Sequence, residues 1–339
     1  MPAPDRPPTL PFPIRIGAAF WIQRTDWASL AEAILAAEAA GADSLWVDDH
    51  LLCDEGDADD PKLEGWTTLA AVAAITRRAR LGLLVAANTV RNPGLTAKLA
   101  VTVDQISDGR AILGLGGGWF EREHDAFGID FGGSFGERLD RLDEATGLIR
   151  RLLDGERVTH AGASYTFKDA VCEPRPVQAH LPIMIGGSGP RKTLRIVARY
   201  ADMWNSFGTP DTIAASSAIL DEHCAAIGRD PATIERTFCI NVVARAARAE
   251  AVSTWETYRA VHKPGEGEGR VAVGSPAEIG AALASYARVR FTHPILVFRS
   301  PWDIETIERL GDIKAALEAA FASGEDQRPG DLRASASRA

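Results

Sequence analysis

A run of small residues stands immediately before Pro190 and a helix-like segment in this chain of 339 residues. Its members are Gly186, Gly187, Ser188 and Gly189. Glycines let backbone N–H groups approach an anion, and the positive end of a following helix favours negative charge. The run therefore predicts a phosphate cradle, although a tight strand-to-helix turn that binds nothing would use the same residues. A nucleoside-triphosphatase loop is not predicted, because that motif needs a glycine where Arg191 stands.

A second glycine cluster leads directly into Trp119 and comprises Gly114, Gly116, Gly117 and Gly118. It fails the dinucleotide-binding fingerprint because Trp119 occupies the position of the third glycine. Small residues at the end of a strand still let a flat ring approach the backbone, and Trp119 could then form a pocket wall. Alternatively, Trp119 packs beneath the loop that follows it.

Two histidines are candidates for proton transfer. His50 directly follows Asp49, and His124 lies in a long segment after the second glycine cluster. An unperturbed imidazole titrates near physiological pH, so either ring could donate or accept a proton. A purely structural role is the alternative for both.

The spacing of other reactive residues does not predict metal or hydrolytic sites. The seven histidines contain no H-x-x-x-H pair and the four cysteines contain no C-x-x-C pair, so no transition-metal site is expected. The acidic run between residues 48 and 60 lacks the spacing of a calcium-binding loop. No G-x-S-x-G motif occurs, so nucleophilic hydrolysis is not predicted either.

Eight short apolar runs, each followed by a longer amphipathic segment, must position these residues. Such alternation is typical of β/α units, and eight units predict a single closed (β/α)₈ TIM barrel of the α/β class. The predicted strands are 14–19, 44–48, 81–85, 111–115, 182–186, 202–206, 238–244 and 294–299. The predicted helices are 26–40, 64–77, 94–107, 134–153, 190–200, 210–227, 275–287 and 301–322. Chemistry in such barrels lies at the carboxyl ends of the strands, where the candidate residues fall.

The barrel is predicted to span residues 14–322. It follows an extended, proline-stiffened arm at 1–13 and precedes a loose tail at 323–339. Two intervals, near 155–180 and 246–274, are not needed for a minimal (β/α)₈ barrel. We expect them to be insertions that form lids or elements of the rim. The first contains the hairpin-like sequence VTHAGASYTFKD.

Charge and composition limit the expected partners. With 37 basic and 46 acidic residues the net charge is −9, which provides no basic footprint for nucleic acid or an anionic membrane. No apolar stretch is long enough for a membrane span, and the scattered cysteines are typical of reduced thiols in a cytoplasmic protein. We therefore expect a small-molecule substrate.

Several segments, in order from about residue 14 to 245, resemble the bacterial luciferase-like superfamily and, more narrowly, its coenzyme F-420-dependent (deazaflavin) oxidoreductases. The resemblance rests on SLWVDDH, LEGWTTLAAVAAITRRARLG, VRNPGLTAKLAVTVDQISDGRAILGLGGGWFEREHDAFGIDF, ERLDRLDEA, PIMIGGSG and TLRIVARYADMWN. It implies a (β/α)₈ barrel that holds a flavin or deazaflavin at the strand carboxyl ends, with the ring deep inside and the phosphate tail toward the rim.

The resemblance also implies roles for individual residues. Asp49 and His50 would lie near the ring, and Ala86, Ala87 and Asn88 would form a segment beneath it. In this family that segment often carries a bulge or a non-prolyl cis peptide. The other implied cofactor-binding residues line the pocket, as Gly116, Gly117, Trp119 and His124, or hold phosphate, as Gly186, Gly187, Ser188 and Gly189.

The expected reaction is hydride transfer between C5 of coenzyme F-420 and a small organic substrate, with His50, oriented by Asp49 or a neighbour, exchanging the accompanying proton. No set of Lys and Arg at the strand ends predicts a sugar-phosphate substrate. An FMN-dependent monooxygenase served by a separate reductase is the alternative among enzymes, and a non-catalytic flavin-binding protein is the alternative outside them. The alanine-rich helices LAAVAAI and LTAKLAVTV could pack against a second copy, so a homodimer is expected.

Overall fold

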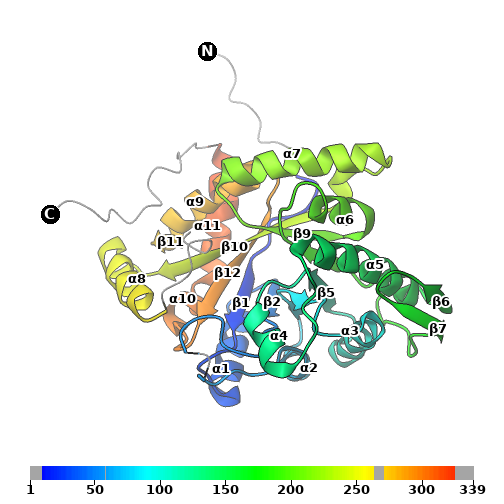
Figure 1. The fold of residues 1–339 in the computed structure, drawn as a ribbon. Helices are drawn as coiled ribbons and strands as arrows, with labels where there is room; N and C mark the ends of the chain where they lie inside the picture. The colour runs from blue at the N-terminus through cyan, green and yellow to red at the C-terminus, as the bar shows by residue number, and fades with distance from the viewer. Residues whose placement is uncertain (1–9, 58, 263–270, 325–339) are drawn as a thin grey trace, which may run out of the picture.

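The computed structural model describes residues 10–57, 59–262 and 271–324, which form a closed barrel of parallel strands ringed by helices (Figure 1). The barrel strands, in order, are β1 (Gly17–Trp21), β2 (Ser44–Val47), β3 (Arg80–Leu83), β5 (Ala111–Gly116), β8 (Ile183–Gly186), β9 (Met203–Ser206), β10 (Glu235–Ala244) and β12 (His293–Arg299). Strand β12 pairs in parallel with β1, which places Gly17 beside Ile295 and closes the barrel. The predicted (β/α)₈ fold is confirmed.

The helices that cover the barrel begin close to their predicted starts. They are α1 (Trp27–Ala39), α2 (Gly65–Ile75), α3 (Pro93–Ser107), α5 (Phe135–Leu153), α6 (Thr193–Tyr200), α7 (Pro210–Ala226) and α9 (Pro276–Arg288). In α9, Ser275 and Glu278 form a reciprocal capping box and Pro276 occupies the first turn, where it costs no hydrogen bond. The last predicted helix is divided at Arg309 into α10 (Ile304–Glu308) and α11 (Leu310–Ser323).

The first insertion is a two-stranded hairpin of β6 (Val158–Ala161) and β7 (Thr166–Ala170), so the predicted hairpin is confirmed. Glu144 of α5 holds it, because this carboxylate accepts hydrogen bonds from His160 Nε2 at 2.8 Å and from the Ser164 amide at 3.0 Å. The hairpin therefore lies beside α5 (Figure 1).

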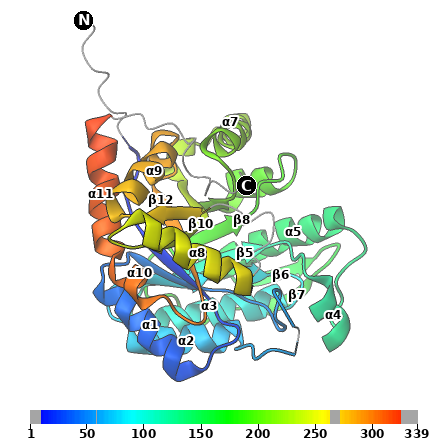
Figure 2. The same ribbon diagram turned by 90° about the vertical axis from the view of Figure 1, so that its left-hand side faces the viewer.

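The second insertion contains α8 (Arg248–His262) and β11 (Val271–Gly274), which were not predicted as separate elements. Strand β11 extends the sheet by pairing with β10, and Trp255 of α8 packs with Val243 and Val271. Figure 2 shows α8 running in front of β10. Residues 263–270 of this insertion, and most of the predicted arm and tail, lie outside the described residues.

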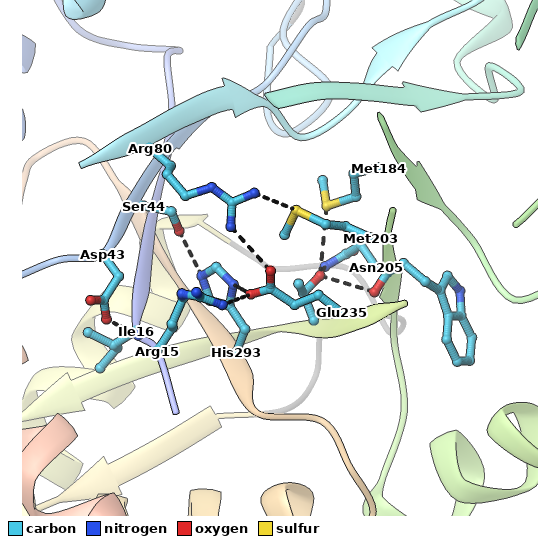
Figure 3. Close-up of polar contacts among 12 residues, drawn as sticks. Arg15, Ile16, Asp43, Ser44, Arg80, Met184, Met203, Asn205, Glu235 and His293 are labelled. Atoms are coloured by element: carbon cyan, nitrogen blue, oxygen red, sulfur yellow. Dashed lines mark hydrogen bonds and ion pairs between the residues drawn. The ribbon is translucent and has the colours of Figure 1, made fainter. Parts of the chain in front are cut away.

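A buried polar network fills the amino end of the barrel (Figure 3). The Glu235 carboxylate accepts hydrogen bonds from Arg15 at 2.8 Å, Arg80 at 3.2 Å and His293 Nδ1 at 2.8 Å. The other ring nitrogen of His293 lies 2.8 Å from Ser44 Oγ. Although burial opposes ionisation, the His293 hydrogen bond and the charges of His293, Arg80 and Arg15 hold the pKa of Glu235 well below its usual value. Because Ser44 and His293 are fully enclosed, this arrangement is structural.

Replacing Glu235 by glutamine is expected to lower the free energy of unfolding by about 3 kcal/mol, because it leaves the half-buried guanidinium groups of Arg15 and Arg80 without their buried carboxylate. The pKa of Glu235 is lower in the folded state than in the unfolded state, where it is about 4.3. The difference in free energy of unfolding between wild type and the variant is therefore complete above about pH 4.3, and it decreases as the pH falls below that value toward the folded-state pKa. Chemical unfolding of both proteins at a series of pH values measures this, and equal stabilities at neutral pH would contradict it.

Candidate functional site

His50 lies just beyond the carboxyl end of β2 and is held by a glutamate from a distant part of the chain. Its Nδ1 lies 3.1 Å from Oε1 of Glu123, and Oε2 of the same carboxylate accepts the Leu51 amide at 2.7 Å. The Glu123 side chain is 1% exposed, whereas that of His50 is 14% exposed. The imidazole therefore remains accessible while the group that orients it is enclosed.

Glu123 belongs to α4 (Glu121–Phe127), a short helix that the sequence did not predict. The residues that α4 buries are Glu123 and His124, and both are polar. A helix with a polar buried face has no apolar periodicity, so hydrophobic spacing could not reveal it.

Two aromatic rings flank the imidazole of His50. The ring centroids of Trp119 and Phe120 lie 5.3 Å and 5.5 Å from that of His50, and both pairs meet edge to face. Trp119 is 61% exposed and so stands as an open aromatic wall beside the histidine rather than beneath the following loop.

The pKa of His50 lies above its ordinary value. Burial alone would lower this pKa, but the hydrogen bond to Glu123 and the negative charges of Asp48, Asp54 and Glu123 outweigh burial. A larger fraction of His50 is therefore protonated at neutral pH than of a free histidine.

The Asp49 carboxylate is bound to an arginine and forms no hydrogen bond with His50. It forms a two-point ion pair with Arg91, at 2.6 Å and 3.0 Å, and Arg91 also contacts Glu64 at 2.7 Å. Burial raises the pKa of Asp49, against the lowering effect of the Arg91 charge. The neighbour that orients His50 is thus Glu123, and Asp49 instead links the end of β2 to the segment that precedes α3.

The segment after β3 contains a cis peptide between Leu84 and Val85, followed by the short strand β4 (Ala86–Ala87), which pairs with β5. This agrees with the feature that the family resemblance implied. Val85 and the backbone before it fill the space that the glycines of β5 leave open. A Cβ on Gly116 would lie 2.7 Å from Val85 Cγ2, and a Cβ on Gly114 would lie 2.0 Å from the Leu83 carbonyl oxygen. The glycine cluster is therefore required for this close approach.

Asn88 anchors the same segment from outside the barrel. Its amide N–H donates to the Gly116 carbonyl at 3.0 Å, and its side-chain Nδ2 donates to Tyr165 Oη at 3.0 Å. Tyr165 belongs to the hairpin insertion. This insertion therefore contacts Asn88, the residue that directly follows Ala86 and Ala87.

His124 is buried, with both ring nitrogens engaged. Nδ1 donates to the Phe120 carbonyl at 2.8 Å, which leaves Nε2 to accept from Thr89 Oγ1 at 2.8 Å. The side chain therefore ties α4 to the segment that follows β4, and it does not present a free nitrogen to the barrel mouth.

The predicted cradle lies at the end of β8. Gly187 has a φ of +114°, donates its amide to the Asn205 carbonyl at 3.0 Å and accepts from Trp204 Nε1 at 2.8 Å. Within the described part of the chain, the amides of Ser188 and Gly189 have no hydrogen-bond acceptor. Two free N–H groups follow a strand and precede α6, as an anion site requires.

Two further observations fit a phosphorylated ligand at this end of the barrel. The hydroxyl of Ser206, at the end of neighbouring β9, is buried without a hydrogen-bond partner. A Cβ on Gly189 would lie 2.8 Å from Thr193 Oγ1, so a side chain there would crowd the turn. The residues present at this turn are therefore compatible with a phosphate group of a ligand.

The fold is a (β/α)₈ barrel whose carboxyl end carries a partly exposed histidine and a glycine-rich turn with two unpaired amides. The chain belongs to the luciferase-like monooxygenase family, whose model matches residues 12–274. The predicted family resemblance is confirmed.

Relatives of this chain include F420-dependent enzymes. It is 31% identical over 317 residues to an F420-dependent glucose-6-phosphate dehydrogenase of Kineococcus radiotolerans, covering 85% of this chain and 92% of that protein. It is 33% identical over 168 residues to an uncharacterized protein of Mycobacterium tuberculosis, which is half of this chain and 58% of that protein's length.

Solved structures show the same fold. An F420-dependent secondary alcohol dehydrogenase in complex with an F420-acetone adduct aligns with a TM-score of 0.77 at 20% identity, covering 91% of this chain and 99% of that one. The long-chain alkane monooxygenase LadA aligns with a TM-score of 0.78 at 15% identity, covering 91% and 92%.

Two other kinds of feature are absent from the described residues. No helix among them has the length and apolarity to cross a membrane. The same residues contain no cluster of three or more histidine, cysteine, aspartate or glutamate side chains suited to a metal ion.

Proposed function

We propose that this chain is a coenzyme F-420-dependent oxidoreductase that transfers hydride between the deazaflavin and a small organic substrate. The observation that carries the proposal is the accessible, carboxylate-bound imidazole of His50 on the same barrel end as the free amides of Ser188 and Gly189. The F420-dependent relative that matches most of the chain supports this choice of cofactor.

When bound, the deazaflavin would supply two-electron hydride chemistry at C5. The amides of Ser188 and Gly189 would bind its phosphate, and Val85 with Ala86 would support its ring. Nε2 of His50 would give or take the proton that accompanies the hydride. Trp119 would restrict the access of water to the reacting atoms.

Charge pairing favours an uncharged substrate. Among the described residues at the barrel mouth, Arg91 is paired with Asp49 and Glu64, and Arg299 is paired with Glu55 at 2.8 Å. Neither of these two guanidiniums has a free charge to offer a phosphate, and Arg191, which forms no ion pair among the described residues, follows the turn at 186–189 that we assign to the cofactor phosphate. We therefore propose an alcohol, imine or activated alkene rather than a sugar phosphate as the substrate class.

Titration of the purified protein with coenzyme F-420 and with FMN, each oxidised and reduced, tests the choice of cofactor. We expect selective binding of the deazaflavin and no rapid oxygen consumption by the reduced complex. Preferential binding of reduced FMN with a transient oxygen adduct would instead establish a monooxygenase. Deazaflavin binding without any substrate-dependent redox change would indicate a non-catalytic binding protein.

A further inference from the structure

We propose that Glu123 is a positioning residue that fixes which nitrogen of His50 exchanges the proton, by holding Nδ1 and leaving Nε2 to the reacting molecule. This inference rests on the proposed role of His50 in proton transfer. It assigns a function to α4, which no sequence motif indicated.

The Glu123 carboxylate is held in one orientation. Both of its oxygens are used, Oε1 by His50 Nδ1 and Oε2 by the Leu51 amide. The Leu51 amide can only donate, so it fixes the orientation of the carboxylate and directs Oε1 at the imidazole. A carboxylate oxygen in turn requires a proton on Nδ1, which makes Nε2 the nitrogen that gains and loses a proton.

Further contacts fix the position of α4, which carries Glu123. His124, the next residue of α4, is bonded to Thr89, and Arg138 Nε donates to the Gly118 carbonyl at 3.2 Å just before the helix. The rings of Trp119 and Phe120 contact the imidazole in edge-to-face geometry. A proton-transfer group works best when packing and hydrogen bonds behind it fix its rotamer, and α4 provides both.

Several other carboxylates lie near His50, but Glu123 is the one that contacts its ring. Asp48 is bound to Lys62, and Asp49 is bound to Arg91, so each of these carboxylates already has a cationic partner. Asp54 has one buried oxygen without a hydrogen-bond partner, and its pKa is raised mainly by burial. Glu123 is the carboxylate that both contacts the imidazole and adds negative charge beside it. Its removal is therefore expected to lower the pKa of His50.

The test compares wild-type protein with Glu123→Gln and with the control Glu121→Gln, which changes an exposed glutamate two residues earlier on α4. Nitrogen-15 NMR of the imidazole, assigned by difference against His50→Gln, reports its tautomer and pKa without any cofactor. We expect the Nδ1–H tautomer in the wild type and in Glu121→Gln. In Glu123→Gln we expect a lower pKa and a mixture of tautomers, because a glutamine cannot accept from both Nδ1 and the Leu51 amide.

Turnover provides the second readout. Glu123→Gln is expected to lower kcat at neutral pH by about 10-fold to 100-fold and to move the pH profile toward lower pH, with the Kd for coenzyme F-420 within about 2-fold of wild type. An unchanged tautomer and pKa in Glu123→Gln would overturn the inference. If that variant does not fold, a neutral Nε2–H tautomer in the wild type overturns it equally. Full activity of His50→Gln would overturn the proposed function instead, and it would leave the NMR result intact.

Discussion

Replacement of His50 by alanine is expected to lower kcat by about 10² to 10⁴, the range that a positioned proton-transfer group contributes. The imidazole lies at the barrel mouth with Nδ1 bound to Glu123, so its loss removes the proton route without removing any part of the cradle at residues 186–189. Cofactor affinity should therefore change little. Steady-state kinetics together with a direct titration of coenzyme F-420 separate the two quantities.

Two variants make this result specific. His50→Gln retains a hydrogen-bonding side chain but cannot titrate, so it should be nearly as impaired as alanine. His180→Ala removes an exposed histidine that is paired with Asp202, and it should retain wild-type turnover. A parallel loss of turnover and cofactor binding in His50→Ala would show that the residue binds cofactor rather than moves a proton.

Replacement of Gly187 by alanine is expected to raise the Kd for coenzyme F-420 at least about tenfold, which corresponds to about 1.4 kcal/mol. Gly187 adopts a φ of +114°, which a residue with a Cβ rarely adopts. A shift of this residue would break its bonds to Asn205 and Trp204 and move the amides of Ser188 and Gly189. At saturating cofactor, kcat should recover.

The matched control is Gly228→Ala, at a glycine that also has a positive φ and has open space around the added methyl group. It lies beyond the far end of α7 and should place an alanine at positive φ without the binding defect. Equal cofactor affinity in Gly187→Ala and wild type would argue that the turn at residues 186–189 binds no phosphate.

The barrel strands could be predicted because most of them contain a short apolar run bounded by polar residues or glycine. Strand 44–48 of the prediction corresponds to β2 (Ser44–Val47), and 202–206 corresponds to β9 (Met203–Ser206). Helix starts were predictable where proline or a capping side chain marks them, as at Ser275. Helix α4 escaped prediction because Glu123 and His124 are the residues that it buries.

The end of the barrel at which the candidate residues lie could be predicted from the sequence. Which side chains contact one another there could not. The carboxyl ends of parallel strands bring His50, Trp119 and Gly187 to one end of the barrel, as the (β/α)₈ pattern requires. Which carboxylate reaches the imidazole depends on how a loop packs, and Glu123 is 73 residues away in sequence. Adjacency in the chain favoured Asp49, but alternate residues of an extended segment point in opposite directions, and Asp49 is directed toward Arg91.

We propose that this chain catalyses hydride transfer between a deazaflavin and a carbon atom of its substrate, and the reducing direction can be followed with an isotope. A single turnover of the complex with coenzyme F-420 reduced with deuterium at C5, run with alkene, imine and carbonyl substrates under labelled oxygen, tests it most directly. We predict deuterium on a carbon atom of the product, no incorporation of labelled oxygen, and loss of the reaction in His50→Ala. Labelled oxygen in the product, with the deuterium retained by the cofactor or lost to water, would contradict the account.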